Sequence, residues 1–499
     1  MTTLANSNKP TLYIVAYQYV DYNTRIHKQA LLLSDLGFDV HVICFGRIDN
    51  DGFEDREKYC IHRVVIKSLK DRVKSQWYRV VSFLRMFSPY KLTPRLHLKY
   101  RKGLLNKKNH YEVNIKTQNN GVRVRNKKTE HILLQLFART IFEIITLCSR
   151  ALVLCEHFLG KPIGASFKAS AQRFFKVLFI TEFAFKCANV IERAESNVYF
   201  AHDLYALPVA YWLSRRHNCQ FVYDSVELSL GRNRLAPPGL VSRFMISRTE
   251  ALARKADAVF AAWPYLKKIL EKKYGVKRVV LLLNCPQYRP YRRSSYLDDK
   301  IYRDHNTLIV LYIGVITEGR GIKELIESVK YLNNRFKVVL IGPVAQNYKE
   351  QLNRVLRKEA NDSRLFILDP VPPNKVVEYA SSADVGIIPI QDNCLTQIYC
   401  LPNKLFQNIM AGLPIVANNL KGIGTYVKEN GLGSVFNDLL PQSIADAINR
   451  LVIDNNSFQA IRNRVLEKAK EMCWEKEKEK FVKAMEPIYL FSRERLMNM

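Results

Sequence analysis

An arginine that follows a glycine-ended strand is the clearest candidate for anion chemistry in this chain. In the stretch YIGVITEGRGIKELIESV, an apolar run ends at Gly314, where the missing side chain would let a ligand approach the backbone, and a helix over residues 322–332 is predicted after Arg320 and Gly321. A guanidinium and the free amides at the start of a helix both stabilise bound phosphate. A leaving diphosphate gains negative charge as its bond breaks, so these groups could stabilise that transition state without a metal ion. An ordinary strand-to-helix turn with a solvated arginine is the alternative that this stretch alone leaves open.

A second stretch in the same half of the chain predicts groups that face the same phosphates. In SSADVGIIPIQDNCLTQIYCLPNKLFQNIMAGLPIVAN, Pro402 stands where a helix over residues 403–410 should begin. Proline favours the first turn of a helix because the amide it lacks would have no partner inside the helix. The amides that follow Pro402 are therefore expected to join Arg320 at one diphosphate.

The elements that must position these residues form two series of alternating strands and helices. A chain of 499 residues exceeds the size of a single hydrophobic core, so at least two domains are expected. The alternation is typical of parallel sheets covered by helices, which predicts an α/β fold of two Rossmann-like domains whose sheets face across a cleft. The predicted parts are a first domain over residues 1–290, a linker over 291–306, a second domain over 307–472, and C-terminal helices over 473–499 that cross back to the first domain.

Residues 67–192 form a basic insertion that a plain domain of this kind would not need, and they carry most of the excess charge behind the net +31. Two helical patterns in the second half of this insertion mix apolar and basic residues, which suits helices lying on an anionic membrane surface. Packing of these helices on each other and on the domain is the alternative. Nucleic acid is a less favoured partner, because the charges lie among apolar helices instead of aromatic platforms.

The remaining composition favours a cytoplasmic protein. The ten cysteines are scattered without a C-x-x-C pair, which is typical of reduced thiols. The N-terminus lacks the pattern of a secretory signal, and charged residues interrupt the richest apolar region before it could span a bilayer. We therefore expect a peripheral protein on the inner face of the membrane.

The two stretches around Arg320 and Pro402 resemble the family 4 retaining glycosyltransferases of the GT-B fold, especially bacterial polysaccharide and glycolipid enzymes. The shared patterns are a strand, a turn and an arginine-glycine pair, followed later by LPNKLFQNIMAGLP. The likeness covers both α/β domains but leaves out the basic insertion. It implies that the second domain binds a nucleotide-diphosphate sugar, linked to uridine or guanosine, with no cofactor and no metal.

The resemblance also implies roles for individual residues of the second domain. Arg320 would bind the donor diphosphate and act in catalysis, while the backbone of Asn403, Lys404 and Leu405 would hold phosphate. Three departures matter. Many relatives have an arginine directly after the strand glycine, where this chain has Val315. The paired glutamates of the family, eight positions apart, are here Tyr399 and Gln407. We expect Tyr399 at the catalytic position and Gln407 at the donor ribose.

Three stretches of the first domain resemble the acceptor side of the same enzymes. NVYFAHDLYALP places His202, a candidate catalytic residue, and Asp203 at the end of a strand that faces the cleft. VYDSVEL and AYQYVDYNTRIHKQA add further candidates for contacts with the acceptor. Local capping is the alternative for several of these residues, including a helix start at Asn23 or Thr24. The expected acceptor-binding residues are Asp21, Arg25, Asp203, Asp224 and Glu227. Asp298 and Asp299 fall in the linker and are expected to be solvated, not bound to a metal.

Two functions of different classes are consistent with these patterns. The first is a retaining, metal-independent hexosyltransferase that moves a sugar to a lipid-linked or oligosaccharide acceptor between the two domains. The second is a GT-B scaffold that has lost catalysis together with its glutamates, and that senses a sugar nucleotide or assists an active transferase.

Overall fold

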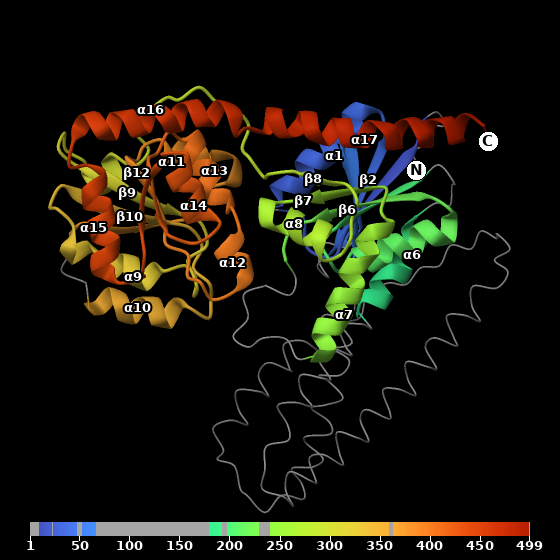
Figure 1. Cartoon of the computed structure of the whole chain (residues 1–499), viewed down its shortest axis with the longest axis horizontal. Helices are drawn as coiled ribbons and strands as arrows, with labels where there is room; N and C mark the ends of the chain where they lie inside the picture. The colour runs from blue at the N-terminus through green and yellow to red at the C-terminus, as the bar shows by residue number, and fades with distance from the viewer. Residues whose placement is uncertain are drawn as a thin grey trace, which may run out of the picture. The chain divides into compact units, whose positions relative to one another are not determined.

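The structure is a computed structural model that describes residues 9–21, 23–46, 52–65, 179–191, 197–228, 240–358 and 363–498 (Figure 1). The chain divides into two compact units, of which one joins Met1–Ile66 to Ile180–Met499 and the other is Lys67–Phe179. Almost all of the second unit lies outside the described residues, and with it most of the basic insertion. The first unit contains both of the described sheets.

The first domain is built on one eight-stranded sheet in the order β3-β4-β2-β1-β5-β6-β7-β8. Its neighbours are parallel except for β3 and β4, which form an antiparallel hairpin at one edge. Strands β1 and β5 are buried along almost their whole length, as expected for a sheet that is covered on both faces. The strands are β1 (Thr11–Ala16), β2 (Asp39–Phe45), β3 (Gly52–Arg56), β4 (Tyr59–Val64), β5 (Val198–His202), β6 (Gln220–Ser225), β7 (Ala258–Ala261) and β8 (Val279–Leu281).

Helices connect these strands as the alternating sequence predicts. Asn23 caps the first of them, α1 (Thr24–Leu36), and Gly37 ends it in the left-handed conformation with φ of 115°. The other long connections are α6 (Leu207–His217), α7 (Leu240–Glu250) and α8 (Pro264–Lys272). Helix α7 is followed by a 3-10 turn, Ala251–Lys255.

One segment of the predicted membrane-surface helices is instead part of the protein core. Residues 179–190 are helical, and Phe183 and Cys187, one turn apart on this helix, are completely buried. The ring of Phe183 packs edge-on against Tyr17 and Phe45 of the first domain. For this segment the apolar spacing marks a buried face, which is the more common reason for such a pattern. The rest of the predicted membrane surface lies outside the described residues.

The second domain has a six-stranded sheet, all parallel, in the order β11-β10-β9-β12-β13-β14. Its strands are β9 (Leu308–Ile313), β10 (Phe336–Ile341), β11 (Leu365–Leu368), β12 (Val385–Ile388), β13 (Ile415–Asn418) and β14 (Gly433–Phe436). The helices are α9 (Ile322–Glu327), α10 (Lys349–Lys358), α11 (Val376–Ala380), α12 (Leu395–Tyr399), α13 (Asn403–Met410), α14 (Ile423–Glu429) and α15 (Pro441–Leu451). Helix α9 is shorter than the sequence predicts, because the last turn, Val329–Tyr331, is 3-10. Together the two sheets confirm the predicted α/β fold.

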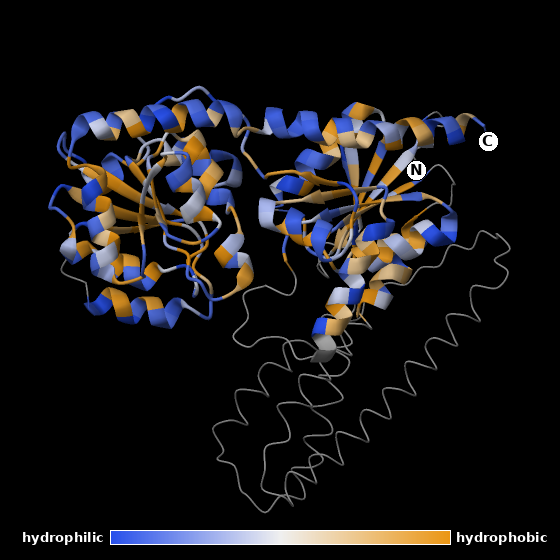
Figure 2. Ribbon diagram, viewed as in Figure 1, coloured by the Kyte–Doolittle hydropathy of each residue, from blue (hydrophilic) through white to orange (hydrophobic). Residues whose placement is uncertain are grey.

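The chain passes between the two domains twice. After α16 (Asn455–Glu471), helix α17 (Trp474–Met497) returns to the first domain and packs against α1 and β8 (Figure 1). Phe481, Met485 and Ile488 of α17 are buried in the same core as β1 and β2. Figure 2 shows the strands and the inner sides of the helices as hydrophobic, with polar residues outside.

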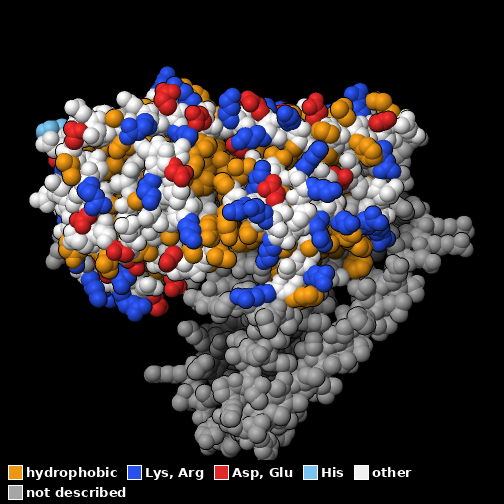
Figure 3. Space-filling view, viewed as in Figure 1, with side chains coloured by type: hydrophobic (Ala, Val, Ile, Leu, Met, Phe, Trp, Pro, Cys, Tyr) orange, Lys and Arg blue, Asp and Glu red, His pale blue; other side chains and the backbone are white. Residues whose placement is uncertain are grey.

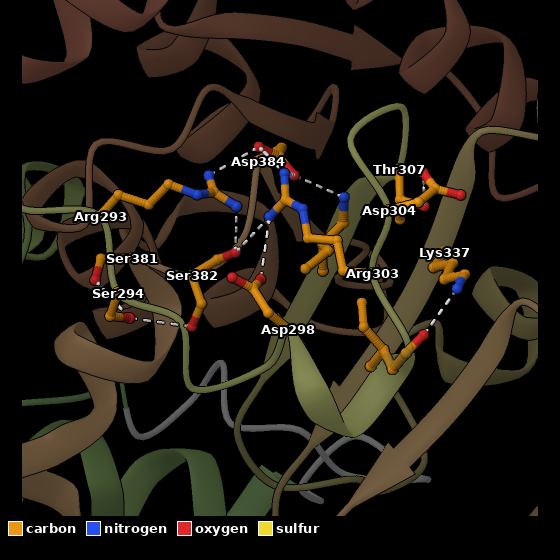
Figure 4. A network of polar contacts seen from close by, with 12 residues as sticks. Arg293, Ser294, Asp298, Arg303, Asp304, Thr307, Lys337, Ser381, Ser382 and Asp384 are labelled. Carbon is orange, nitrogen blue, oxygen red and sulfur yellow. Dashed lines mark hydrogen bonds and ion pairs between the residues drawn. The ribbon is translucent and has the colours of Figure 1, made fainter.

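The predicted linker is held to the second domain by a buried carboxylate, Asp384 (Figure 4). Arg293 and Arg303 reach this carboxylate at 3.1 Å, and both also donate to the carbonyl oxygen of Ser382. The amide of Ile309 donates to Asp384 at 2.8 Å, so a strand end joins the same network. Asp298, which we expected to be solvated, lies 3.5 Å from Arg303. Most of the linker is therefore fixed to one domain.

The packing of α17 on the first domain can be tested with two phenylalanines of the same helix. Phe481 is 1% exposed, whereas Phe491 is 46% exposed. The substitution Phe481→Ala should lower the free energy of unfolding by about 3–5 kcal/mol, because it leaves a cavity in the core. Phe491→Ala should change it by no more than about 0.5 kcal/mol. Urea denaturation followed by tryptophan fluorescence measures both, and equal losses would contradict the docking of α17.

Candidate functional site

A cavity of about 720 Å³ is lined by residues of both domains. The first domain contributes the loop after β1, the end of β5 and residues that follow β6 and β7. The second contributes Arg320, the residues around α12 and the turn that begins α13. The carboxyl ends of parallel strands are where ligands bind in folds of this kind. Of the predicted residues, Asp21, Arg25, His202, Glu227, Arg320, Pro402 and Asn403 line this cavity.

Arg320 lines this cavity, and it lies close enough to Lys404 to act on its charge; neither cation has a carboxylate partner among the described residues. Lys404 is half-buried, with its ammonium nitrogen 3.4 Å from the centre of the Tyr312 ring. Burial lowers the pKa of Lys404 well below its usual value, and the nearby Arg320 lowers it further. A buried ammonium is costly unless an anion compensates it. The pair therefore has the electrostatics of an anion site.

The glycines of this region make room for protein groups, which differs from the expected approach of a ligand. A Cβ atom on Gly314 would lie 2.5 Å from Cε of Lys404, so the missing side chain makes space for that lysine. Gly321 has φ of 65°, and a Cβ there would meet the carbonyl oxygen of Pro389. Both glycines are required by packing, and only the first has a direct consequence for the anion site.

Helix α13 begins where the sequence predicts, with Pro402 before its first residue and Asn403 at the cavity wall. The amides of Asn403 and Lys404 have no partners inside the helix, so they are available to a ligand. Leu405 is completely buried, and its amide already donates to the carbonyl oxygen of Pro402 at 2.9 Å, so the predicted phosphate contact of its backbone has no support in this geometry. Helix α9 after Arg320 has just six residues, which makes its start a weaker anion site than we expected.

Arg25 and Asp224, both predicted to bind the acceptor, are instead bound to each other. Two guanidinium nitrogens donate to the two carboxylate oxygens at 2.8 and 2.6 Å, and a third donates to the carbonyl oxygen of Leu282. Gln29 adds a further hydrogen bond to Asp224 at 2.8 Å. Asp224 is completely buried and Arg25 is 2% exposed. Such a paired, fully bonded group is unavailable to a substrate, so both residues have a positioning role.

The other predicted residues of the first domain differ in their access to the cavity. His202 lines it from the end of β5, and its Nδ1 lies 3.2 Å from Asp224. Asp21 lines it too, but it also accepts a hydrogen bond from Arg63 at 2.7 Å. Glu227 is exposed at the wall of the cavity. Burial raises the pKa of the Cys400 thiol, and the charge of Glu227 raises this pKa further. Asp203, which has φ of 69°, does not line the cavity.

The two positions where the resemblance implies glutamates do not line the cavity. Tyr399 stacks face to face on Tyr265 of the first domain, with ring centroids 3.7 Å apart. Its hydroxyl lies 3.3 Å from the ammonium of Lys421. Gln407 lies one turn further along α13 than the residues that reach the wall. The expected catalytic contact of Tyr399 and ribose contact of Gln407 therefore have no support in this geometry.

Sequence reasoning missed several residues of the wall. Cys394 precedes the first residue of α12 and Gln397 lies in its middle, while Trp263 and Asn284 follow strands of the first domain. Asn23 had been considered only as a helix cap, which it also is. The short helix α12 gave no periodic signal, so its orientation could not be read in advance. No group of three or more metal-ligating side chains occurs in the part of the chain that the structure describes.

Comparison with known proteins agrees with this geometry. Residues 297–472 match the family model of Glycosyl transferases group 1. A D-inositol 3-phosphate glycosyltransferase from Corynebacterium glutamicum is 23% identical over 176 residues, which are 34% of this chain and 41% of that protein. The chain thus matches less than half the length of this curated relative.

Solved structures resemble nearly the whole chain. A sucrose-phosphate synthase from Thermosynechococcus elongatus has a TM-score of 0.59 and 12% identity, covering 97% of this chain and 100% of its own. E. coli trehalose-6-phosphate protein bound with UDP-2-fluoro glucose has a TM-score of 0.57 and 10% identity, covering 95% and 99%. A glycosyltransferase from Rickettsia africae has a TM-score of 0.55 and 12% identity, covering 96% and 99%. The chain has the GT-B fold. The cavity with Arg320 and His202 thus lies in the cleft of a GT-B protein.

The space that Gly314 leaves for Lys404 can be tested with a matched glycine. Gly314 and Gly52 have similar φ angles of 135° and 142°, but a Cβ on Gly52 would meet nothing within 4 Å. Alanine at either position should cost about 1–3 kcal/mol of folding free energy through backbone strain. Only Gly314→Ala should also weaken the binding of inorganic pyrophosphate, because it displaces Lys404. Calorimetric titration of both variants measures this, and equal pyrophosphate affinities would show that Lys404 does not depend on Gly314.

Proposed function

We propose that this protein is a glycosyltransferase that moves a sugar from a nucleoside diphosphate onto an acceptor bound between its two domains. The observation that carries the proposal is the pair of uncompensated cations, Arg320 and Lys404, beside the start of α13. A diphosphate supplies the missing negative charge, and it gains more charge as the glycosidic bond breaks. The match to Glycosyl transferases group 1 and the UDP-2-fluoro glucose held by the E. coli neighbour support the same function.

Proton uptake on donor binding is the sharpest test of this site. The pKa of Lys404 is lowered by burial and by Arg320, and a bound diphosphate favours the charged ammonium and raises that pKa again. Between the two values, UDP binding should take up a proton, and the affinity should fall as the pH rises. Titration calorimetry in buffers of different ionisation enthalpy measures the uptake as the slope of the apparent binding heat.

Two substitutions at the same position provide the control. Lys404→Arg keeps a charge that does not titrate, so UDP binding should persist without proton uptake. Lys404→Met should lower UDP affinity by about tenfold to hundredfold, since hydrogen bonds to charged groups contribute roughly 1.5–3 kcal/mol. If all three proteins bound UDP with the same affinity and the same proton uptake, Lys404 would not be part of the donor site.

The finer proposal is a hexosyltransferase that retains the configuration of the sugar and works without a metal ion. It rests on the family resemblance and on the guanidinium, ammonium and helix amides that would stabilise the leaving diphosphate. The donor nucleotide would be uridine or guanosine diphosphate. Incubation with each nucleotide sugar, with and without a chelator, followed by NMR of the anomeric proton, tests all these points. A product with inverted anomeric configuration would contradict the retaining mechanism, and loss of activity on chelation would contradict metal independence.

A donor-binding protein without turnover is the second candidate. The stacking of Tyr399 on Tyr265 favours it, because this leaves no carboxylate of the second domain where the family places one. Among the described residues that line the cavity, the carboxylates are Asp21 and Glu227, both of the first domain. Binding of UDP-sugar without transfer or hydrolysis, across a panel of acceptors and membrane lipid extract, would support this function over the enzyme.

A lipid-linked acceptor and a peripheral place on the cytoplasmic face of the membrane are further parts of the proposal. They are supported by the charge and apolar patterns in residues 67–178, which lie outside the described residues. No helix that the structure describes is long and apolar enough to cross a bilayer. On the face shown in Figure 3, Lys and Arg side chains are dispersed over both domains with acidic ones among them. The two domains therefore offer no single basic patch on this face.

Membrane binding has a direct test in vesicle flotation. The full chain should float with vesicles that contain anionic lipid and should not float with neutral ones. Raising the salt concentration should weaken the binding, because salt screens exposed charges within a short distance. Flotation that does not depend on anionic lipid would contradict an electrostatic membrane surface.

A further inference from the structure

His202 is enclosed by two partners at the floor of the cavity. It is 2% exposed and ends strand β5. Its Nε2 lies 3.3 Å from the amide nitrogen of Asn23, and its Nδ1 lies 3.2 Å from a carboxylate oxygen of Asp224, close to it but outside the alignment of a hydrogen bond. A neutral histidine carries its proton on one nitrogen only, and the partners of the two nitrogens decide which.

The orientation of Asn23 is fixed by the helix it caps. Its side-chain oxygen accepts a hydrogen bond from the backbone amide of Ile26 at 3.2 Å. That backbone group can only donate, so the oxygen of Asn23 must face it. The nitrogen of Asn23, which also can only donate, is therefore the atom that faces His202. It follows that Nε2 of His202 accepts and carries no proton.

Asp224 gives the same answer from the other side of the ring. Burial alone would raise its pKa, but Arg25 and then His202 bring the pKa well below its usual range. The carboxylate is thus ionised and can only accept, so its place 3.2 Å from Nδ1 favours the histidine proton on that nitrogen, in agreement with the constraint from Asn23. The three donors already on Asp224, two from Arg25 and one from Gln29, prevent it from rotating away.

We propose that Asn23 and Asp224 are positioning residues that hold His202 with its proton on Nδ1, so that Nε2 accepts a hydrogen bond from a hydroxyl of the sugar substrate. This inference rests on the proposed function for the nature of the substrate. Asn23 also lines the cavity, so a hydroxyl that enters can share or take over its hydrogen bond to Nε2. A phosphate or carboxylate oxygen has no proton to donate and is disfavoured there.

The assignment divides the cavity by chemistry. Arg320 and Lys404 attract the phosphates, and His202 selects the part of the substrate that carries hydroxyl groups. A phosphate beside His202 would lie near the ionised Asp224 and the carboxylates of Asp21 and Glu227, which also repel it. Recognition through a fixed acceptor of this kind penalises an analogue that lacks the hydroxyl, because the buried nitrogen loses a partner.

The tautomer can be measured without any turnover, so this test is independent of the proposed function. The two ring nitrogens of a neutral histidine have well-separated ¹⁵N shifts, and the protein labelled at its ten histidines can be compared with the variant His202→Gln to assign the signal. The wild type should show a protonated Nδ1 and an unprotonated Nε2. A proton on Nε2 in the unliganded wild type would overturn the proposal.

The variant Asn23→Asp separates positioning from folding. Aspartate caps a helix as well as asparagine does, so α1 should be retained. Its carboxylate accepts where the amide donated, so the proton of His202 should appear on Nε2. Asn284→Asp is the charge control, because Asn284 lines the same cavity without a hydrogen bond to His202 among the described residues, and it should leave the ¹⁵N signal in place. A shift of the signal in both variants would show a general effect of charge and refute the role of Asn23.

Kinetics then links the tautomer to the substrate. Asn23→Asp should lower kcat/KM by about tenfold or more while leaving UDP affinity within about threefold, since the phosphates bind to the other domain. Asn23→Ser, which keeps a cap, should have a smaller effect.

Deoxy analogues of the sugar substrates test the hydroxyl itself. With the wild type, one of these analogues should react more slowly than the full sugar. With His202→Gln, the same analogue and the full sugar should react at the same rate. If every deoxy analogue behaved alike in both proteins, His202 would bind no substrate hydroxyl. A wild type without transferase activity would defeat the proposed function and its substrate hydroxyl, while the tautomer stands or falls by the ¹⁵N signal alone.

Discussion

The second-domain side of the cleft holds two positive charges, Arg320 and Lys404, that no carboxylate among the described residues neutralises. Enclosing an ammonium costs free energy, and placing a guanidinium nearby increases that cost. The surroundings reduce it only in part, through the ring of Tyr312 under Lys404 and the space beside Gly314. The unliganded protein is therefore less stable than it would be with an anion in place. An anion bound beside Arg320 and Lys404 would relieve this repulsion, so the electrostatics favour anions at this end of the cleft.

The wall formed by the first domain differs, because its buried charges compensate each other. Asp224 and Arg25 satisfy each other, and together they join β6, α1 and the chain after β8. The pair makes this wall rigid. His202, which lies against Asp224 and lines the cavity, is held in place by it. A cleft with one uncompensated and one compensated wall would bind anions at a single place. The other wall can then distinguish neutral groups by hydrogen bonding.

The sequence predicted the two sheets and the helix Asn403–Met410, because alternating apolar segments and a proline at a helix start are local signals. It did not predict the pairing of Arg25 with Asp224, which are 199 positions apart and meet only when strands order in space. It also missed the direction of Tyr399, since α12 is too short to show a face. Gly314 was recognised as special, but its reason was not, because the group that fills its space comes from Lys404. Residue types and strand ends could be predicted from the sequence, whereas the partners of individual side chains could not.

The two passages of the chain between the domains lie next to each other. The amide of Trp474, at the start of α17, donates to the carbonyl oxygen of Pro286 at 2.7 Å. From there, Asp384 fixes the linker to the second domain, and α17 is packed on the first. Bending is consequently restricted to a few residues around this one hydrogen bond, which would serve as a pivot. Two adjacent covalent connections permit rotation about a line through both of them and oppose sliding or twisting. Opening and closing of the cleft would then follow a single path, so that the groups on its two walls return to the same alignment in each cycle.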